Sequence, residues 1–558
     1  MILIFGGTTE GRIAVDVCEQ AGKPFYYSTK SGSQEVVLHY GKRLTGAMTA
    51  EDVRRFCREH DIRCIIDAAH PFAEMLHSTV AESGMPVVRL CRKFAEHKSG
   101  VTYLKSWDEA VKSINCRRLL ALSGVNTIAK LKDYWKNHDT TFRILNRQES
   151  MDIVWKNGFP EERILFYPQA MPTIEEEMAM MQDSGCDAIL TKESGESGGF
   201  DVKVRAALNL GLKVYVVECP TLPKDWLYVD GPHTLRRAIQ SIVPEYFPLR
   251  TGLTTGACAT AAAKAAVVSS LTGECPEEVS FCLPDGEVLT IPVECDETGK
   301  ATVVKESNDD YDVTKGCRIT ASVSLRDDDA IVFLQGDGVG NVTLPGLGIP
   351  VGEPAINPTP RRMITDEIRS ITGEGVDVKL SVENGEALWK QTFNHKVGVV
   401  GGISIIGTSG IVSPLSNDAF IESIGRELQV AKAIGHTAIG FASGKKGENA
   451  LKAMEPDLRI IHYGNFIGEA LKMAHQLGFQ RVVIGIMIGK AVKLAEGHLD
   501  THSHKVSADL SRWGVNMARE LWDVMPPSFF KGVEERCQNT CRTVFPEGEL
   551  DVKLIRDI

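Results

Sequence analysis

The chain has 558 residues, of which 62 are basic and 73 acidic, and its formal net charge is −11. This acidic balance argues against a nucleic-acid-binding protein, because such proteins normally carry a basic face. No apolar run approaches the length of about 18 residues that a membrane span needs, and the opening MILIF lacks the basic flank and the length of a signal peptide.

Short apolar strands alternate with amphipathic helices from the N-terminus to about residue 246. This alternation predicts the α/β class, with parallel sheets covered by helices on both faces. Helices are expected at 50–60, 174–184 and 234–242. The predicted strands are 2–5, 24–28, 64–68, 87–90, 119–122, 164–167, 188–191 and 214–217. The proline-containing stretch VPEYFPLRTG predicts a boundary near Pro248, so the expected domains are 1–247 and 248–558.

A glycine-rich turn, FGGTTEGR, follows the first strand and precedes a helix. Backbone N–H groups at such a helix start bind phosphate, and the helix dipole adds to the attraction. The usual dinucleotide fingerprint has a glycine where this chain has Thr8, so an ordinary tight turn is the alternative. The candidate cofactor-binding residues of this turn are Gly6, Gly7, Thr8, Thr9 and Gly11.

The second strand runs into FYYSTKSGSQ, which lacks the acidic residue that NAD-binding domains use to hold the ribose hydroxyls. Thr29, Lys30 and Ser31 offer hydroxyls and a positive charge instead, which suit a 2′-phosphate. The stretch therefore favours NADPH over NADH. The alternative is a polar loop with one solvated lysine.

Two further polar stretches, DAAHPFAE and TKESGESGGF, follow predicted strands. Open α/β sheets bind ligands at the carboxyl ends of their strands, so Ser194 and Gly195 are candidates for substrate binding. Lys192 and His70 are candidate proton donors by residue type, and a water molecule would serve as well. A lone histidine or a glycine-rich turn is more often structural than catalytic.

Taken together, FGGTTEGR, DAAHPFAE, SGVNTIAKL and TKESGESGGFDVKVRAA resemble the signature stretches of the precorrin-6A reductases of cobalamin biosynthesis. The resemblance covers nearly all of residues 1–245. It implies an NADPH-dependent reduction of one double bond in a corrin-ring precursor. It also implies two Rossmann-like lobes with the ligands between them. The family commonly has alanine at the place of Gly11, a change small enough to leave phosphate binding intact.

The second half has a different pattern of apolar runs and turn residues, which predicts an α+β fold with an α/β portion. An alanine-rich helix follows TGLTTGACAT, residues 279–345 form a mostly antiparallel section, and strands alternate with helices again over 396–489. The stretch LQGDGVGNVT is similar to the S-adenosylmethionine loop of common methyltransferases. The proline- and glycine-rich sequence after it excludes the helix that this loop requires.

Several ordered stretches of this half resemble the cobalt-precorrin-5B C1-methyltransferases of the anaerobic cobalamin pathway. These are LRTGLTTGACATAAAKAA, EPAINPTPRRMI, GGISIIGTSGIVSP, HYGNFIGEAL and IGKAVKLAEGHLDTHSHKV. The resemblance implies transfer of a methyl group from S-adenosylmethionine to C1 of the macrocycle, on a fold unlike the common methyltransferases. Cobalt then arrives within the substrate, and no protein metal site is expected.

Site residues in this half follow from the many carboxylates of such a substrate, which arginine forks suit well. A surface salt bridge is the alternative for each arginine, and Lys490 and Lys493 are similar cases. His502 is a candidate base, and its place in DTHSHK makes metal binding by a His-x-His pair a weaker alternative. The candidates for S-adenosylmethionine are Gly464, Asn465 and Gly468. The candidate substrate-binding residues are Arg250, Thr254, Thr255, Arg361 and Arg362.

The two resemblances describe successive steps, so a fusion would deliver the methylated product to the reductase at high effective concentration. The expected partners are tetrapyrroles, without nucleic acid or membrane, and a homo-oligomer is left open. Fourteen cysteines without a regular spacing predict reduced thiols and a cytoplasmic protein. The alternatives are a corrinoid or nucleotide sensor that has lost activity, and a dehydrogenase fused to an unrelated β-rich domain.

Overall fold

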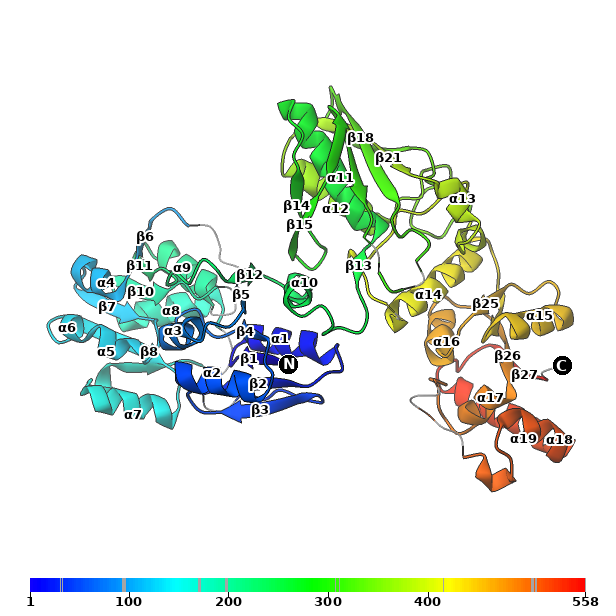
Figure 1. Ribbon diagram of the computed structural model, residues 1–558, viewed down its shortest axis with the longest axis horizontal. Helices are drawn as coiled ribbons and strands as arrows, with labels where there is room; N and C mark the ends of the chain where they lie inside the picture. Colours follow the sequence, from blue (N-terminus) through cyan, green and yellow to red (C-terminus); the bar gives the residue numbers. More distant parts are fainter. Residues whose placement is uncertain are drawn as a thin grey trace. The chain divides into compact units, whose positions relative to one another are not determined.

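The computed structural model divides into two compact units, Met1–Pro248 and Leu249–Ile558 (Figure 1). None of the helices described is both long enough and apolar enough to cross a membrane. The structure describes residues 1–30, 32, 34–92, 97–168, 172–195, 199–306, 308–310, 312–414, 416–502, 506 and 509–556.

The first unit contains two six-stranded sheets in which every strand pair is parallel. The strands of one sheet, in spatial order, are β12 (Leu227–Val229), β5 (Val87–Leu90), β4 (Cys64–Asp67), β1 (Ile2–Phe5), β2 (Phe25–Thr29) and β3 (Gly41–Thr45). Those of the other are β6 (Val101–Leu104), β11 (Lys213–Val217), β10 (Ala188–Lys192), β7 (Arg118–Ala121), β8 (Asp139–Ile144) and β9 (Ile164–Phe166). The predicted α/β class is confirmed for this half.

Helices connect these strands, and the predicted helix at 174–184 is confirmed as α8. The last helix, α10, returns with β12 to the first sheet, where Leu235 and Ile239 share a core with Ile2 and Ile4. The helices are α1 (Thr9–Glu19), α2 (Ala50–Glu59), α3 (Glu74–Glu82), α4 (Trp107–Ser113), α5 (Thr127–Lys130), α6 (Lys132–Trp135), α7 (Gln148–Asn157), α8 (Ile174–Ser184), α9 (Phe200–Asn209) and α10 (Pro232–Ile242).

The first helix of the second unit, α11 (Thr255–Thr272), is rich in alanine and packs against a five-stranded sheet and against α12 (Pro358–Arg369). The small side chains of α11 let it be buried along most of its length. The sheet has the order β16 (Glu294–Glu297), β17 (Lys300–Val304), β18 (Arg318–Arg326), β21 (Gly375–Val382) and β19 (Ile331–Gln335). All pairs are antiparallel except β19 with β21, so the expected mostly antiparallel section is confirmed.

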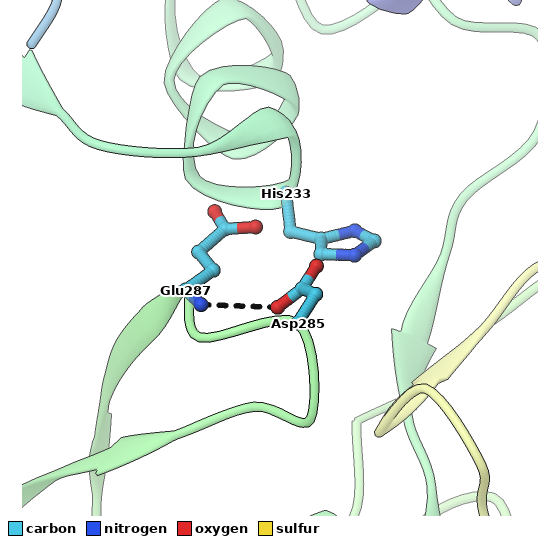
Figure 2. Close-up of side chains that lie close together, drawn as sticks. All are labelled: His233, Asp285 and Glu287. Atoms are coloured by element: carbon cyan, nitrogen blue, oxygen red, sulfur yellow. Dashed lines mark hydrogen bonds between the residues drawn. The ribbon is translucent and has the colours of Figure 1, made fainter. Parts of the chain in front are cut away.

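Small two-stranded sheets flank this sheet. The hairpin of β14 (Glu278–Cys282) and β15 (Val288–Pro292) turns at Asp285, whose carboxylate accepts a hydrogen bond from the Glu287 amide at 3.0 Å (Figure 2). The other pairs join β13 (Gly252–Leu253) to β23 (Ile411–Val412) and β20 (Asn341–Val342) to β22 (Val399–Val400). A strand and not a helix follows Gly336–Gly340, as expected from its prolines and glycines.

A parallel four-stranded sheet forms the rest of the unit, in the order β25 (Ile460–His462), β24 (Ala438–Ala442), β26 (Arg481–Met487) and β27 (Glu549–Ile555). The expected strand–helix alternation is confirmed, and β27, near the C-terminus, pairs with β26 along seven residues. The helices are α13 (Gly385–Trp389), α14 (Asn417–Ala433), α15 (Lys445–Met454), α16 (Ile467–Gln476), α17 (Ile488–Ala495), α18 (Leu521–Val524) and α19 (Pro527–Arg542). Short 3-10 helices cover Glu161–Arg163, Asn394–Val397, Ser511–Trp513 and Ala518–Glu520.

Candidate functional sites

The turn between β1 and α1 has an open face. Thr8 caps the helix, since its hydroxyl accepts from the Gly11 amide at 3.2 Å and donates to the Ala68 carbonyl at 2.7 Å. Gly7 has a φ of +100°, and a Cβ there would meet nothing within 4 Å. Its amide donates to the hydroxyl of Tyr27 at 3.0 Å and to Oε1 of Gln34 at 3.1 Å. Thr9 is exposed beside it.

Gly6 and Gly11 are explained by packing within the protein. A Cβ on Gly6 would lie 2.3 Å from the ring of Tyr27, and one on Gly11 would lie 2.9 Å from its hydroxyl and 3.0 Å from Cα of Gly6. Gly11 thus lets the start of α1 lie close to Gly6 and Tyr27. Tyr27 thus connects the end of β2 to the glycine turn.

The end of β2 carries an unpaired hydroxyl. Thr29 is buried, and its Oγ1 has no hydrogen-bond partner among the described residues. A buried polar atom without a partner is costly and commonly marks a place where a ligand or water binds. Lys30 follows and is exposed. Ser31, the third residue predicted here, lies outside the described residues.

A buried charged cluster follows β4. The Asp67 carboxylate accepts from Nδ1 of His77 at 2.7 Å and from Nη1 of Arg89 at 2.9 Å. Burial alone would raise the pKa of Asp67, but His77 and Arg89 lower it. His77 also holds the carbonyls of His70 and Pro71 with Nε2, at 3.1 and 3.2 Å. Sequence reasoning missed this cluster, although its aspartate begins the DAAHPFAE stretch.

His70 and Lys192 face one region at the carboxyl ends of β4 and β10. Nδ1 of His70 accepts from the Phe72 amide at 3.2 Å, and burial followed by the charge of Lys192 lowers the pKa of His70 to about 3. Nζ of Lys192 lies 5.4 Å from the centre of the Phe72 ring. Burial, followed by the charge of Lys203, lowers the pKa of Lys192 to about 8. His70 is therefore neutral near pH 7, whereas Lys192 carries its proton.

Arg92 connects the two sheets of this unit. It forms an ion pair with Glu10 of α1, with Nε 3.0 Å from Oε1, and donates through Nη1 to the Ser194 carbonyl at 2.7 Å. Glu10 and Ser194 are buried, and Oε2 of Glu10 has no partner among the described residues. Gly195 follows with a φ of +71°. Arg92 thus joins α1, the helix that follows the predicted cofactor turn, to Ser194, which was predicted for the substrate.

The glycine–threonine turn of the second unit is buried. Thr254 caps α11 by accepting from the Ala257 amide at 3.1 Å. The Thr255 hydroxyl donates to the Ser404 carbonyl at 3.1 Å and accepts from the Ile406 amide at 2.9 Å. A Cβ on Gly256 would lie 2.6 Å from Cγ of Pro360. The hydroxyl of Thr255 is therefore engaged by the protein.

The predicted arginines have three different environments. Arg250 pairs with Asp309 at 3.1 Å and is largely exposed. Arg361 donates through Nε to the Ile356 carbonyl at 2.8 Å and pairs with Glu353 at 2.8 Å, so it holds the loop before α12. Arg362 is exposed, and no described residue forms an ion pair with it.

A cavity of about 770 Å³ lies at the carboxyl ends of β24, β25 and β26, and we call it the basic cavity. Its lining includes the turn 443–447 that opens α15, residues 487–490 at the start of α17, and Asn465 and Thr501. Sequence analysis missed the 443–447 turn, because SGKKG is indistinguishable from an ordinary polar helix start. The cations that line it are Lys445, Lys446, Lys490, Lys493 and Arg519.

The turn after β25 borders this cavity. Gly464 has a φ of +58°, and its carbonyl accepts from Nζ of Lys490 at 2.5 Å. The Asn465 carbonyl accepts from the Thr501 amide at 3.0 Å. A Cβ on Gly468 would meet Cβ of Leu499 at 2.8 Å, which explains that glycine by packing. His502 follows Thr501, and its amide donates to Asp500 at 3.1 Å.

A second cavity, of about 380 Å³, is lined by the start of α12 and by α14. Asn357 and Thr359 of the AINPTP stretch and Thr408 of the GTSG stretch belong to its lining. Glu422 and Arg426 face it as an ion pair at 2.5 Å. Phe420 of the same helix lies against Gly464, so α14 connects this cavity to the turn that borders the basic cavity.

Comparisons with known proteins match the two halves separately. Residues 1–242 match the family model described as Precorrin-6x reductase CbiJ/CobK, and residues 243–414 match the family model described as CbiD. A cobalt-precorrin-5B C(1)-methyltransferase of Prosthecochloris aestuarii is 41% identical over 345 residues, which cover 55% of this chain and 94% of that protein. A protein of the same name from Agrobacterium fabrum is 45% identical over 276 residues, covering 48% of this chain and 73% of that protein.

Two solved structures are similar to parts of the chain. The cobalamin biosynthesis protein CbiD of Archaeoglobus fulgidus is 30% identical, covers 46% of this chain and 83% of its own, and gives a TM-score of 0.27. A structure described as CobK precorrin-6A reductase is 17% identical, covers 44% of this chain and 98% of its own, and gives a TM-score of 0.36.

Proposed function

Because the chain belongs to the cobalt-precorrin-5B C(1)-methyltransferase family and carries a CbiJ/CobK reductase domain ahead of it, we propose that it catalyses two successive steps of cobalamin biosynthesis. Residues 248–558 would methylate C1 of cobalt-precorrin-5B with S-adenosylmethionine. Residues 1–247 would then reduce the product, cobalt-precorrin-6A, to cobalt-precorrin-6B with NADPH. The observation that carries the proposal is the match over 94% of the length of a methyltransferase, joined to a reductase model over residues 1–242.

The first unit fits NADPH at the carboxyl ends of β1 and β2. The unpaired hydroxyl of Thr29, with Lys30 beside it, would hold the 2′-phosphate. The Gly7 amide donates to the neutral oxygens of Tyr27 and Gln34, and a phosphate oxygen would replace these acceptors. When bound, NADPH supplies a hydride, and the second carbon of the double bond needs a proton.

We assign that proton to Lys192. Its pKa of about 8 leaves most of it protonated near neutral pH and makes the proton easier to give up than that of an ordinary lysine. His70, with a pKa near 3, is a neutral ring that can only donate a hydrogen bond or orient the substrate. Arg92 would position the cofactor and the substrate relative to each other, because it joins Glu10 of α1 to the turn at Ser194.

The second unit fits S-adenosylmethionine at the second cavity. The Arg426 guanidinium suits the carboxylate of the methionine part, and Glu422 suits its positive groups. When bound, this cofactor supplies an electrophilic methyl group. The protein must hold C1 in line with it, which needs positioning more than acid–base chemistry. This placement would replace the predicted roles of Gly464, Asn465 and Gly468 toward the cofactor, since none of them lines the second cavity. The role of His502 as the base that removes a proton afterwards stays a prediction.

Anaerobic incubation with cobalt-precorrin-5B and S-adenosylmethionine, followed by mass spectrometry before and after addition of NADPH, tests the proposal. We expect a gain of one methyl group, and then of two hydrogens only after NADPH is added. Methylation without reduction would contradict the role of the first unit. Tight binding of both ligands without turnover would contradict both activities and favour a sensor.

The fourteen free thiols agree with a cytoplasmic protein, which we retain as part of the proposal. The substrates are tetrapyrroles, and cobalt enters only within them.

A further inference from the structure

We propose that the basic cavity binds the carboxylates of the tetrapyrrole substrate, and that S-adenosylmethionine binds elsewhere. The proposal rests on the methyltransferase function above and assigns its macrocycle site. Its residues are Lys445, Lys446, Lys490, Lys493 and Arg519.

The charge of the cavity is one-sided. Among the described residues that line it there is no aspartate or glutamate, although the protein as a whole carries a net charge of −11. Glu448 approaches from α15 and pairs with Lys445 at 2.9 Å and with His462 at 3.0 Å. Five cations thus line the cavity, and Glu448 pairs with one of them, Lys445. Such an excess favours a ligand with several negative charges.

Lys490 and Lys493 lie one turn apart on α17, so both side chains project from one face of the helix. Within the described part of the chain, each ammonium group donates to one carbonyl, that of Gly464 at 2.5 Å for Lys490 and that of Thr501 at 3.3 Å for Lys493. An ammonium group has three N–H donors, so each lysine retains donors for a ligand. Burial, followed by the charge of Lys493, lowers the pKa of Lys490, and a bound carboxylate would relieve both effects.

The backbone adds further donors. The helix α15 has ten residues and begins at the cavity, where Gly444 precedes it without a side-chain cap. Its first-turn amides are directed out of the helix start, where the dipole favours anions. Apolar groups of Met487, Leu510 and Met517 line the cavity as well and would contact the faces of a macrocycle.

The two ligands of the reaction differ in charge. S-adenosylmethionine has a sulfonium and an ammonium group against a single carboxylate, so five cations repel it. The tetrapyrrole has acetate and propionate side chains around a large apolar ring. The volume of about 770 Å³ lies toward the upper end of the roughly 300–1,000 Å³ that is usual for ligand sites.

The test uses the full chain and the fluorescent octacarboxylate uroporphyrin, with the tetracarboxylate coproporphyrin as a less charged probe of similar shape. Two double variants remove the cations, Lys445→Gln with Lys446→Gln at the exposed helix start, and Lys490→Met with Lys493→Met inside. Lys452→Gln, on the exposed face of α15 away from the cavity, is the matched control. Binding of S-adenosylmethionine is measured on the same proteins by calorimetry.

We expect each double variant to weaken uroporphyrin binding about tenfold or more, and coproporphyrin binding by less, since each lost charge–carboxylate contact counts for about two- to fivefold. The control and the affinity for S-adenosylmethionine should stay within about twofold. Unchanged uroporphyrin binding in the exposed double variant, which leaves the interior intact, would overturn the proposal. If both double variants lost affinity for S-adenosylmethionine but kept their affinity for uroporphyrin, the cavity would belong to the cofactor, and the proposal would be overturned as well.

The result is independent of turnover. If wild-type protein binds uroporphyrin through these lysines but transfers no methyl group to cobalt-precorrin-5B, the cavity assignment stands and the methyltransferase function fails. If methylation proceeds and the double variants methylate with unchanged KM for cobalt-precorrin-5B, the function stands and the cavity assignment fails.

Discussion

The two units each contain a strand, a turn with glycines and paired threonines, and a helix, yet only the first turn has an open position. Thr8 and Thr254 cap their helices with hydrogen bonds of 3.2 and 3.1 Å. Gly7 nevertheless has open space above it, whereas Gly256 is pressed against Pro360. The local sequence determines the cap in both cases. Whether the helix start can reach a ligand depends on what the rest of the chain packs against it.

The substitution Gly256→Ala should have the largest effect. Its Cβ would lie 2.6 Å from Pro360 Cγ and 2.9 Å from the Ile406 carbonyl oxygen, so the helix must move. We expect the second unit to lose about 3 kcal/mol of stability. Urea titration of the full chain, followed by hydrogen exchange of α11 amides, measures it. Gly273→Ala is the control: its Cβ would meet no atom within 4 Å, and its φ of +75° alone should cost about 1 kcal/mol. A loss as small as the control's would mean that this turn is not packed.

Thr255→Val should come next. Valine preserves the shape but leaves the Ile406 amide without its partner, at a cost of about 2 kcal/mol. The matched change in the first unit is Thr9→Val, at an exposed position, which should cost less than about 0.5 kcal/mol. The same unfolding experiment compares the two. Equal losses would remove the contrast between the turns.

Gly7→Ala tests the open turn for ligand contact. Its φ of +100° makes alanine costly by about 1 kcal/mol, although no atom obstructs the Cβ. We expect NADPH to bind about tenfold more weakly, because the methyl group enters the space left for a phosphate. Gly84→Ala, with a φ of +70° and equally open, lies before the start of β5 and should lose stability without losing NADPH affinity. Fluorescence quenching gives the Kd values, and an unaltered Kd in Gly7→Ala would count against a phosphate site.

The smallest effect, between pH 7 and pH 8, is the change in the rate of reduction by the first unit. If Lys192 donates the proton, the active fraction falls as pH rises through its pKa of about 8. The rate of reduction of cobalt-precorrin-6A at pH 8 should be about half that at pH 7, and should fall about tenfold per unit well above pH 8. Stopped-flow absorbance at saturating NADPH measures it. A Lys192→Met variant that kept the same profile would exclude this lysine.

Much of the fold follows from apolar runs. Ile2–Phe5 and Val87–Leu90 are strands with the predicted bounds, because central strands of parallel sheets are buried on both faces. The strands β3 and β12 were missed, since both lie at the edges of their sheet and have exposed positions. β8 was missed for another reason, as its sequence DTTFRI buries a threonine and an arginine that give no apolar signal.

The candidate sites were less predictable, because they depend on distant contacts. The sequence places Lys192 and His70 at strand ends, but only the fold brings Arg92 onto both Glu10 and Ser194. In the second unit, Thr255 and Arg361 have the residue types of ligand clamps, and the protein itself takes up their hydrogen bonds. The basic cavity collects Lys445 and Arg519 from segments 74 residues apart, which no local pattern records.

The return of β12 and α10 to the first sheet gives this chain a definite order of assembly. The first sheet is begun by residues 2–5 and closed by residues 227–229, while all strands of the second sheet lie between them. On the ribosome, the second sheet is therefore complete while the first still lacks its edge strand and the helix that covers Ile2 and Ile4. The apolar surface of the incomplete first sheet stays exposed, and open to aggregation, until about residue 243 has emerged. The lobe that contains the second sheet is therefore expected to fold first.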